Sequence, residues 1–189
     1  MKRNTSPKAI AIQIPIQQKS VIAIFIMLLF SLTALAQKPT VRTDAGDITV
    51  HVIKEGLNHP WGMAFLPDGR LLVTERAGTL RILEKDSTLS APLSGTPEVF
   101  AQGQGGMLDV ALHPNFDQNK YVYLSFAEPG PNGTASTALG RGKLEGNTIQ
   151  GFETIFRMEP KVEGPNHFGG RIIFTPENEI FLTLAERFK

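Results

Sequence analysis

The segment that sets the architecture reads Gly62-Met-Ala-Phe-Leu-Pro67-Asp-Gly-Arg-Leu-Leu-Val-Thr74, and its pattern recurs twice further along the chain, over residues 108–125 with Pro114 and over residues 170–183 with Pro176. Each copy has an apolar strand, a turn led by proline and a second apolar strand that ends in Thr or Ser. Proline lacks a backbone N–H and fixes φ, so it ends one strand while the polar residues after it reverse the chain. The sequence therefore predicts three copies of one strand-turn-strand unit.

The spacing of these units favours a β-propeller. The prolines lie 47 and 62 residues apart, close to the roughly 40–50 residues of a four-stranded blade. A β-sandwich also has short strands and many turns, but it does not require the same unit three times. We therefore predict an all-β propeller. Since propellers have about four to eight blades, we expect these to be the first blades of a larger, truncated ring.

The first 36 residues have the layout of a secretory signal peptide. They contain no Asp or Glu, four basic residues, an apolar run over residues 21–30 and then Ala34-Leu35-Ala36. An uncleaved anchor is the alternative, although the run is shorter than the roughly 20 residues of a spanning helix. We predict cleavage before Gln37, export to the periplasm or the extracellular space, and no stable membrane anchor afterwards.

The domain organisation after the leader follows from local patterning. Residues 37–47 are polar and are predicted to be a linker, and the alternation of residues 48–53 predicts a half-buried strand. Residues 48–189 are predicted to be the N-terminal part of the propeller domain.

Charge and cysteine content exclude several functions. Without the leader, 15 basic residues face 18 acidic ones, a net charge of −3, and no clustered basic run predicts a nucleic-acid partner. The absence of cysteine in the sequence excludes thiolate catalysis and cysteine-based zinc sites. A small neutral substrate fits this composition better.

Two glycine-rich loops are the candidate binding segments. Residues 163–171 place His167 just before the third repeat, and imidazole accepts a proton near neutral pH. Residues 100–108 place Gln104 among three glycines, where its amide can donate to and accept from a hydroxyl. By itself, a loop histidine is more often a structural or surface group, and a glycine-rich segment is more often a flexible loop between blades.

The other histidines and two carboxylates are predicted to be structural. His51 falls in the expected strand, His59 precedes Pro60, and His113 precedes the proline of the second repeat. Glu75 and Asp109 are predicted to be buried carboxylates that hydrogen-bond between strands.

Four motifs follow one another in a specific order along the chain: Leu57–Gly69, Thr74–Gly78, Gly103–Pro114 and Asn166–Arg171. In their order and spacing they resemble the motifs of the soluble aldose dehydrogenases of the glucose/sorbosone dehydrogenase family, which depend on pyrroloquinoline quinone (PQQ). The resemblance runs from about residue 48 to the end.

The resemblance implies a six-bladed propeller, with about the first three blades in this chain, that binds PQQ and Ca²⁺. It implies that His167 is the base on the anomeric hydroxyl of an aldose, that Gln104 contacts substrate and cofactor, and that Asn166 lies near the sugar. The product would be a lactone, and the electrons would pass to an acceptor that the resemblance does not identify. Relatives often have Gly before the acidic residue where this chain has Ala185-Glu186, so that turn is expected to differ.

The resemblance also places most PQQ ligands and the Ca²⁺ ligands in later blades, so no metal ligand is assigned here and the 189-residue stretch is expected to be inactive by itself. The alternative function is a non-catalytic propeller of the same family that binds a sugar or a protein. A lactone-hydrolysing metal propeller fits less well, because the sequence shows no carboxylate-rich cradle.

Overall fold

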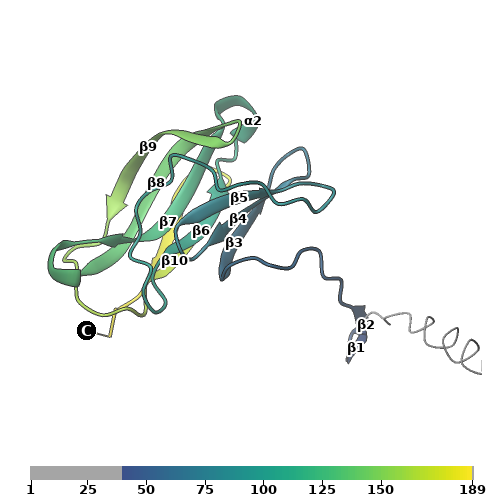
Figure 1. Ribbon diagram of the computed structural model, residues 1–189, viewed down its shortest axis with the longest axis horizontal. Helices are drawn as coiled ribbons and strands as arrows, with labels where there is room; N and C mark the ends of the chain where they lie inside the picture. Colours follow the sequence, from purple (N-terminus) through teal and green to yellow (C-terminus); the bar gives the residue numbers. More distant parts are fainter. Residues whose placement is uncertain (1–39, 189) are drawn as a thin grey trace, which may run out of the picture. The chain divides into compact units, whose positions relative to one another are not determined.

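The computed structural model describes residues 40–188 (Figure 1). Its strands form antiparallel sheets, accompanied by one short helix, α2 (Phe116–Asn119), and one 3-10 turn, η1 (Pro131–Gly133). Within these residues no helix is long and apolar enough to cross a membrane. The chain divides into a unit that ends at Val52 and a unit that begins at Ile53.

The first unit contains a hairpin of β1 (Thr40–Thr43) and β2 (Gly46–Thr49). The part of the expected linker that the structure describes, residues 40–47, thus contains strand, and residues 37–39 lie outside the described residues. The strand expected over 48–53 is wrong beyond Thr49, because residues 50–53, including His51, are exposed and pair with no strand. An alternating pattern forms a strand only where a neighbouring edge offers hydrogen-bond partners.

The second unit contains three sheets whose strands follow one another along the chain. The first has β3 (Pro60–Phe65), β4 (Leu71–Glu75) and β5 (Thr79–Leu83); the second has β6 (Met107–Leu112), β7 (Tyr121–Pro129), β8 (Ala135–Glu145) and β9 (Thr148–Arg157); the third has β10 (Gly169–Phe174) and β11 (Ile180–Leu184). The predicted repeats coincide with β3–β4, β6–β7 and β10–β11, so the repeat prediction is confirmed. The sheet of four sequential antiparallel strands, β6 to β9, has the strand number and strand order of one propeller blade.

The first strands of the three sheets, β3, β6 and β10, run next to one another, with β6 between the other two. Buried polar side chains join them across the sheets. The Thr74 hydroxyl on β4 donates to the carbonyl of Leu108 on β6 at 2.6 Å, and the Ser125 hydroxyl on β7 donates to the carbonyl of Gly170 on β10. These side chains connect strands that no backbone ladder joins.

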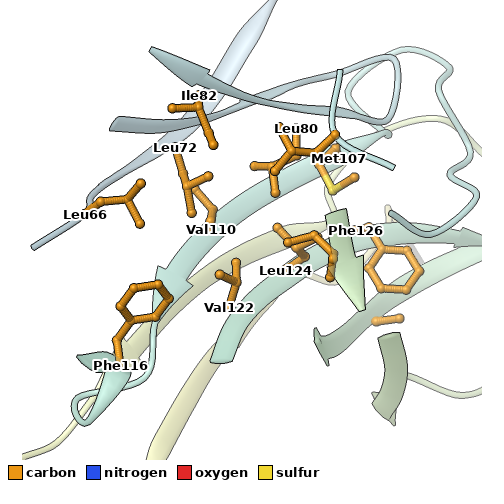
Figure 2. Packing of buried hydrophobic residues seen from close by; sticks show 13 residues of the cluster. Leu66, Leu72, Leu80, Ile82, Met107, Val110, Phe116, Val122, Leu124 and Phe126 are labelled. Atoms are coloured by element: carbon orange, nitrogen blue, oxygen red, sulfur yellow. The ribbon is translucent and has the colours of Figure 1, made fainter. Parts of the chain in front are cut away.

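The main core lies between the first two sheets (Figure 2). Leu72, Leu80 and Ile82 of the first sheet pack against Val122 and Leu124 of the second, and all five are at most 1% exposed. Alternate residues of each strand point to this interface, as the period of two requires. The buried apolar faces fix the register of the strands and thereby the positions of the loops that leave them.

Candidate active site

His167 lies in the loop directly before β10, where its backbone φ is 54°. This left-handed conformation is uncommon for a residue with a side chain and persists where surrounding contacts hold it. One such contact is the backbone N–H of His167, which donates to Oε1 of Gln104 at 2.9 Å. The structure therefore brings the two candidate residues together, although 63 positions separate them in the sequence.

The Gln104 loop packs directly on the His167 loop. The backbone N–H of Gln104 donates to the carbonyl of Pro165 at 2.9 Å, so Gln104 holds the His167 loop through backbone and side chain alike. On its other side, Nη1 of Arg76 donates to the carbonyl of Gly103 at 2.6 Å. At Gly106 the φ is 138°, and a Cβ would run into the carbonyl of Arg76, so glycine permits this close approach.

The His167 imidazole pairs with a carboxylate that follows β11. Its Nδ1 lies 2.6 Å from Oε1 of Glu186. This hydrogen bond holds the pKa of the Glu186 carboxyl below its usual value of 4.5, with a further contribution from backbone hydrogen bonds. Since an ionised carboxylate only accepts, Nδ1 is the donor in this hydrogen bond, and in the neutral imidazole the lone pair is therefore on Nε2. The side chain of His167 is 37% exposed.

Asn166 precedes His167 and lies against the other loop, since its Oδ1 is 2.8 Å from the point where a Cβ on Gly103 would stand. Its backbone carbonyl accepts from Nε of Arg187 at 2.7 Å. The three residues predicted from the sequence, Gln104, Asn166 and His167, are therefore neighbours. The ring of Phe188 lies against the imidazole, tilted by 32°, with 3.5 Å between ring centroids.

The buried carboxylates predicted from the sequence are confirmed. Asp109 is 2% exposed and accepts from Nη1 of Arg171 and from the backbone N–H of Ile172, both at 2.9 Å. Glu75 is 4% exposed and accepts from the backbone N–H of Asn58 at 2.7 Å and from Thr79 at 2.6 Å. Both join segments of the fold and lie outside the His167 cluster.

The side chains of His59 and His113 make other contacts. His113 packs between Tyr123 and Phe174, with centroid distances of 6.2 and 5.7 Å, and its Nδ1 accepts from a backbone N–H. His59 is exposed and hydrogen-bonds the adjacent Asn58 at 2.7 Å. Their structural assignment agrees with these contacts.

Sequence reasoning missed three residues of the site. Glu186 was noted only as part of an altered turn, and Arg76 and Arg187 were not singled out. The sequence did contain a signal for Glu186. In the third repeat, His167 comes just before the first strand and Glu186 comes just after the second. Antiparallel pairing of β10 with β11 brings the start of the first strand beside the end of the second.

The chain is similar to proteins of one family. The family described as glucose/sorbosone dehydrogenase matches residues 57–189. Aldose sugar dehydrogenase YliI of Escherichia coli K12 is 46% identical over 142 residues, which cover 74% of this chain and 38% of that protein. A quinoprotein glucose dehydrogenase B of Acinetobacter calcoaceticus is 28% identical over 150 residues, 72% of this chain and 30% of that protein.

Solved structures agree in fold. A crystal structure of a glucose dehydrogenase superposes with a TM-score of 0.72 at 46% identity, covering 74% of this chain and 42% of that one. The PQQ-bound aldose sugar dehydrogenase of Streptomyces coelicolor gives a TM-score of 0.62 at 30% identity, with 74% and 42% covered. The chain thus spans about two fifths of the length of these structures. The match confirms the predicted all-β propeller class, of which this chain covers only a part, and the chain belongs to the glucose/sorbosone dehydrogenase family.

Proposed function

We propose that this chain is part of a quinoprotein oxidoreductase that oxidises the anomeric carbon of aldose sugars to lactones. The observation that carries the proposal is the His167 cluster, in which an accessible imidazole is bonded through Nδ1 to Glu186 and through its backbone to Gln104. Support comes from family membership and from the printed names of relatives, which are aldose sugar and glucose dehydrogenases.

His167 is the proton acceptor in this proposal. Its Nε2 takes the proton of the anomeric hydroxyl, a C=O bond forms at that carbon, and the electron pair of the C–H bond leaves as hydride. The imidazolium that results is stabilised by Glu186, whose lowered pKa keeps it ionised at neutral pH. Glu186 also fixes the tautomer in which Nε2 is the base.

Gln104 and Asn166 orient the sugar beside this base. Oε1 of Gln104 is used by the backbone of His167, so its amide N–H groups remain to donate to a sugar hydroxyl or to a carbonyl group. Asn166 presents a second amide on the His167 loop. Amides bind neutral hydroxyls without adding charge, in keeping with a neutral substrate.

The residues present fit one edge of PQQ, a flat quinone with three carboxylates. Gln104 offers amide N–H donors, and Arg76, beside Gly103, offers a guanidinium that forms no ion pair with a carboxylate in residues 40–188. When bound, this cofactor supplies a hydride acceptor. We propose that these two side chains and Asn166 hold it on the side of this chain.

Calcium does not fit the described residues. Within residues 40–188 no group of three or more His, Asp or Glu side chains could hold a metal ion. We derive no step through Ca²⁺, and we propose that residues 37–189 by themselves do not turn over an aldose even when PQQ and Ca²⁺ are added.

The proposal is tested with the full-length protein by following dye reduction in the presence of PQQ and an aldose. We expect reduction that requires PQQ, a lactone product, and a slower rate with an aldose deuterated at the anomeric carbon, because that C–H bond breaks. An alditol, which lacks the anomeric hydroxyl, is the matched control and should not react. Tight sugar binding with no PQQ-dependent turnover would instead support the alternative, a non-catalytic binding propeller.

Export is a separate proposal, because residues 1–36 lie outside the described residues. The acid-free basic leader and the Ala34-Leu35-Ala36 site support cleavage. Mass spectrometry of the exported protein should find Gln37 at the N-terminus. An intact Met1 on membrane-bound protein would contradict this.

A further inference from the structure

Arg187 is a buried cation without a carboxylate partner in the described part of the chain. The residue is 2% exposed, and its guanidinium donates to three backbone carbonyls: Nε to Asn166 at 2.7 Å, Nη1 to Ala135 at 2.6 Å, and Nη2 to Gly164. The same guanidinium lies over the ring of Phe168, with Cζ 3.7 Å from its centroid. All four partners lie in the His167 loop or on β8, beside it.

Such an arrangement is costly, because burial removes the hydration of a charge and no opposite charge compensates it. Burial accordingly lowers the pKa of the Arg187 guanidinium. The carbonyl dipoles and the aromatic face recover part of that loss. A neutral side chain of similar length would fill the same space without the electrostatic cost, so the hydrogen bonds themselves must matter to the fold or to the site.

Two of the three carbonyls that Arg187 holds flank the segment that positions His167. Gly164 and Asn166 lie on either side of Pro165, and the carbonyl of Pro165 accepts from Gln104 on the opposite side. His167 follows at once with its φ of 54°. The loop is thus clamped between Gln104 and Arg187, and Arg187 is also next to Glu186, the hydrogen-bond partner of the imidazole.

We infer that Arg187 is a positioning residue that clamps residues 164–168 so that Nε2 of His167 is held for proton transfer. The inference rests on the proposed function of His167 as the base. A planar guanidinium bonds three carbonyls in fixed directions, whereas an ammonium is a point donor that neither reaches all three nor stacks on Phe168. Lysine therefore keeps the charge and loses the clamp, and methionine loses both.

The first measurement is steady-state kinetics of full-length Arg187→Lys and Arg187→Met. A base displaced by about 1 Å costs about 10²-fold in rate, so kcat and kcat/KM should fall together by about that factor while KM stays within about 3-fold. Arg81→Lys is the matched control, since Arg81 also donates to a backbone carbonyl, that of Ser90 at 2.8 and 2.6 Å, which lies outside the His167 loop. Unchanged kcat in both Arg187 variants would overturn the inference.

A double variant separates positioning from a general loss of folding. In the His167→Ala background the base is absent, so Arg187→Lys should lower the remaining turnover by less than about 2-fold, because the two residues act as one unit. A further loss as large as in the wild-type background would mean that Arg187 acts elsewhere, and would overturn the inference.

Amide hydrogen exchange provides a readout that does not depend on turnover. The N–H groups of His167 and Gln104, both bonded across the two loops, should exchange at least about 10-fold faster in Arg187→Met, while those of β7 stay protected. If the wild-type protein shows no aldose oxidation, the proposed function fails; unchanged exchange in the loop overturns the clamp itself.

Discussion

Two of the buried charges in the second unit of this chain, Asp109 and Arg187, are held in different ways. Asp109, on β6, is matched by the guanidinium of Arg171 and by a backbone N–H of β10, so a charge meets a charge between two strands. Arg187, after β11, is matched only by carbonyls and an aromatic ring, within a loop. The first arrangement joins two sheets, and the second fixes the backbone beside His167.

The difference shows that contacts between strands and contacts within the His167 loop have different roles, the first in stability and the second in the reaction. The Asp109 contact lies between strands whose positions are set by the core, so its loss should affect the fold first. The loop of residues 163–168 has no ladder of its own, and its conformation depends on Gln104 and Arg187. Changes there should affect the reaction more than the fold.

The largest expected effect is on turnover, in the loop. His167→Ala in the full-length protein should lower aldose oxidation by about 10² to 10⁴-fold, the range for loss of a general base, with PQQ binding and the unfolding temperature little changed. Measuring kcat, quinone binding and Tm on the same preparation checks this. Near-normal turnover would show that His167 is not the base. A large fall in Tm would show that His167, like Asp109, contributes mainly to stability.

The next effect is on stability, at the strand contact. Asp109→Asn removes the charge that binds Arg171, and a buried hydrogen bond to a charged group contributes about 1.5–3 kcal/mol. We expect the free energy of unfolding to fall by about that amount in urea titrations, with kcat unchanged for the folded protein. Asp117→Asn, at an exposed carboxylate on α2, is the control and should change stability by less than about 0.5 kcal/mol. A large fall in kcat without loss of stability would contradict this assignment.

The contrast between these two contacts also explains what could be predicted from the sequence. The strand pairs follow from local signals, because alternating apolar residues and a proline-led turn specify a hairpin without reference to the rest of the chain. The buried position of Asp109 follows equally, since it sits within an apolar strand. The hairpin of residues 40–49 was missed because its strands are short and exposed, and so carry no clear apolar period.

The candidate site was predictable only in part. Imidazole and amide groups among glycines singled out His167 and Gln104, but their assignment to the site, and that of Asn166, came from the family resemblance. Glu186 and Arg187 were not assigned, because their roles depend on where a strand pair returns the chain, and the register of β10 and β11 is a tertiary property. A buried arginine bonded only to carbonyls leaves no pattern in sequence, since its partners are backbone atoms.

The smallest expected effect is a shift in the pKa of Glu186. Measuring it tests whether the side chains of His167 and Glu186 interact. The hydrogen bond from His167 lowers the pKa of the Glu186 carboxyl from 4.5, so NMR of the Glu186 side chain should show a midpoint below that value, moving up in His167→Ala. Because the pKa is lowered on folding, the interaction stabilises the folded state above the ordinary pH range of a glutamate, and this contribution is lost as pH falls through the lowered pKa. The stabilities of wild type and Glu186→Gln should therefore differ at neutral pH and converge in acid. Both side chains are well exposed, with 37% and 58% of their surfaces accessible, so water screens the interaction and the difference in stability should be small.

Turnover is more sensitive, because Glu186→Gln can present an N–H to Nδ1 and reverse the tautomer, and we expect kcat to fall by at least about 10-fold. A Glu186 midpoint that is the same with and without His167 would show that the two side chains are not coupled, and the tautomer argument would then fail.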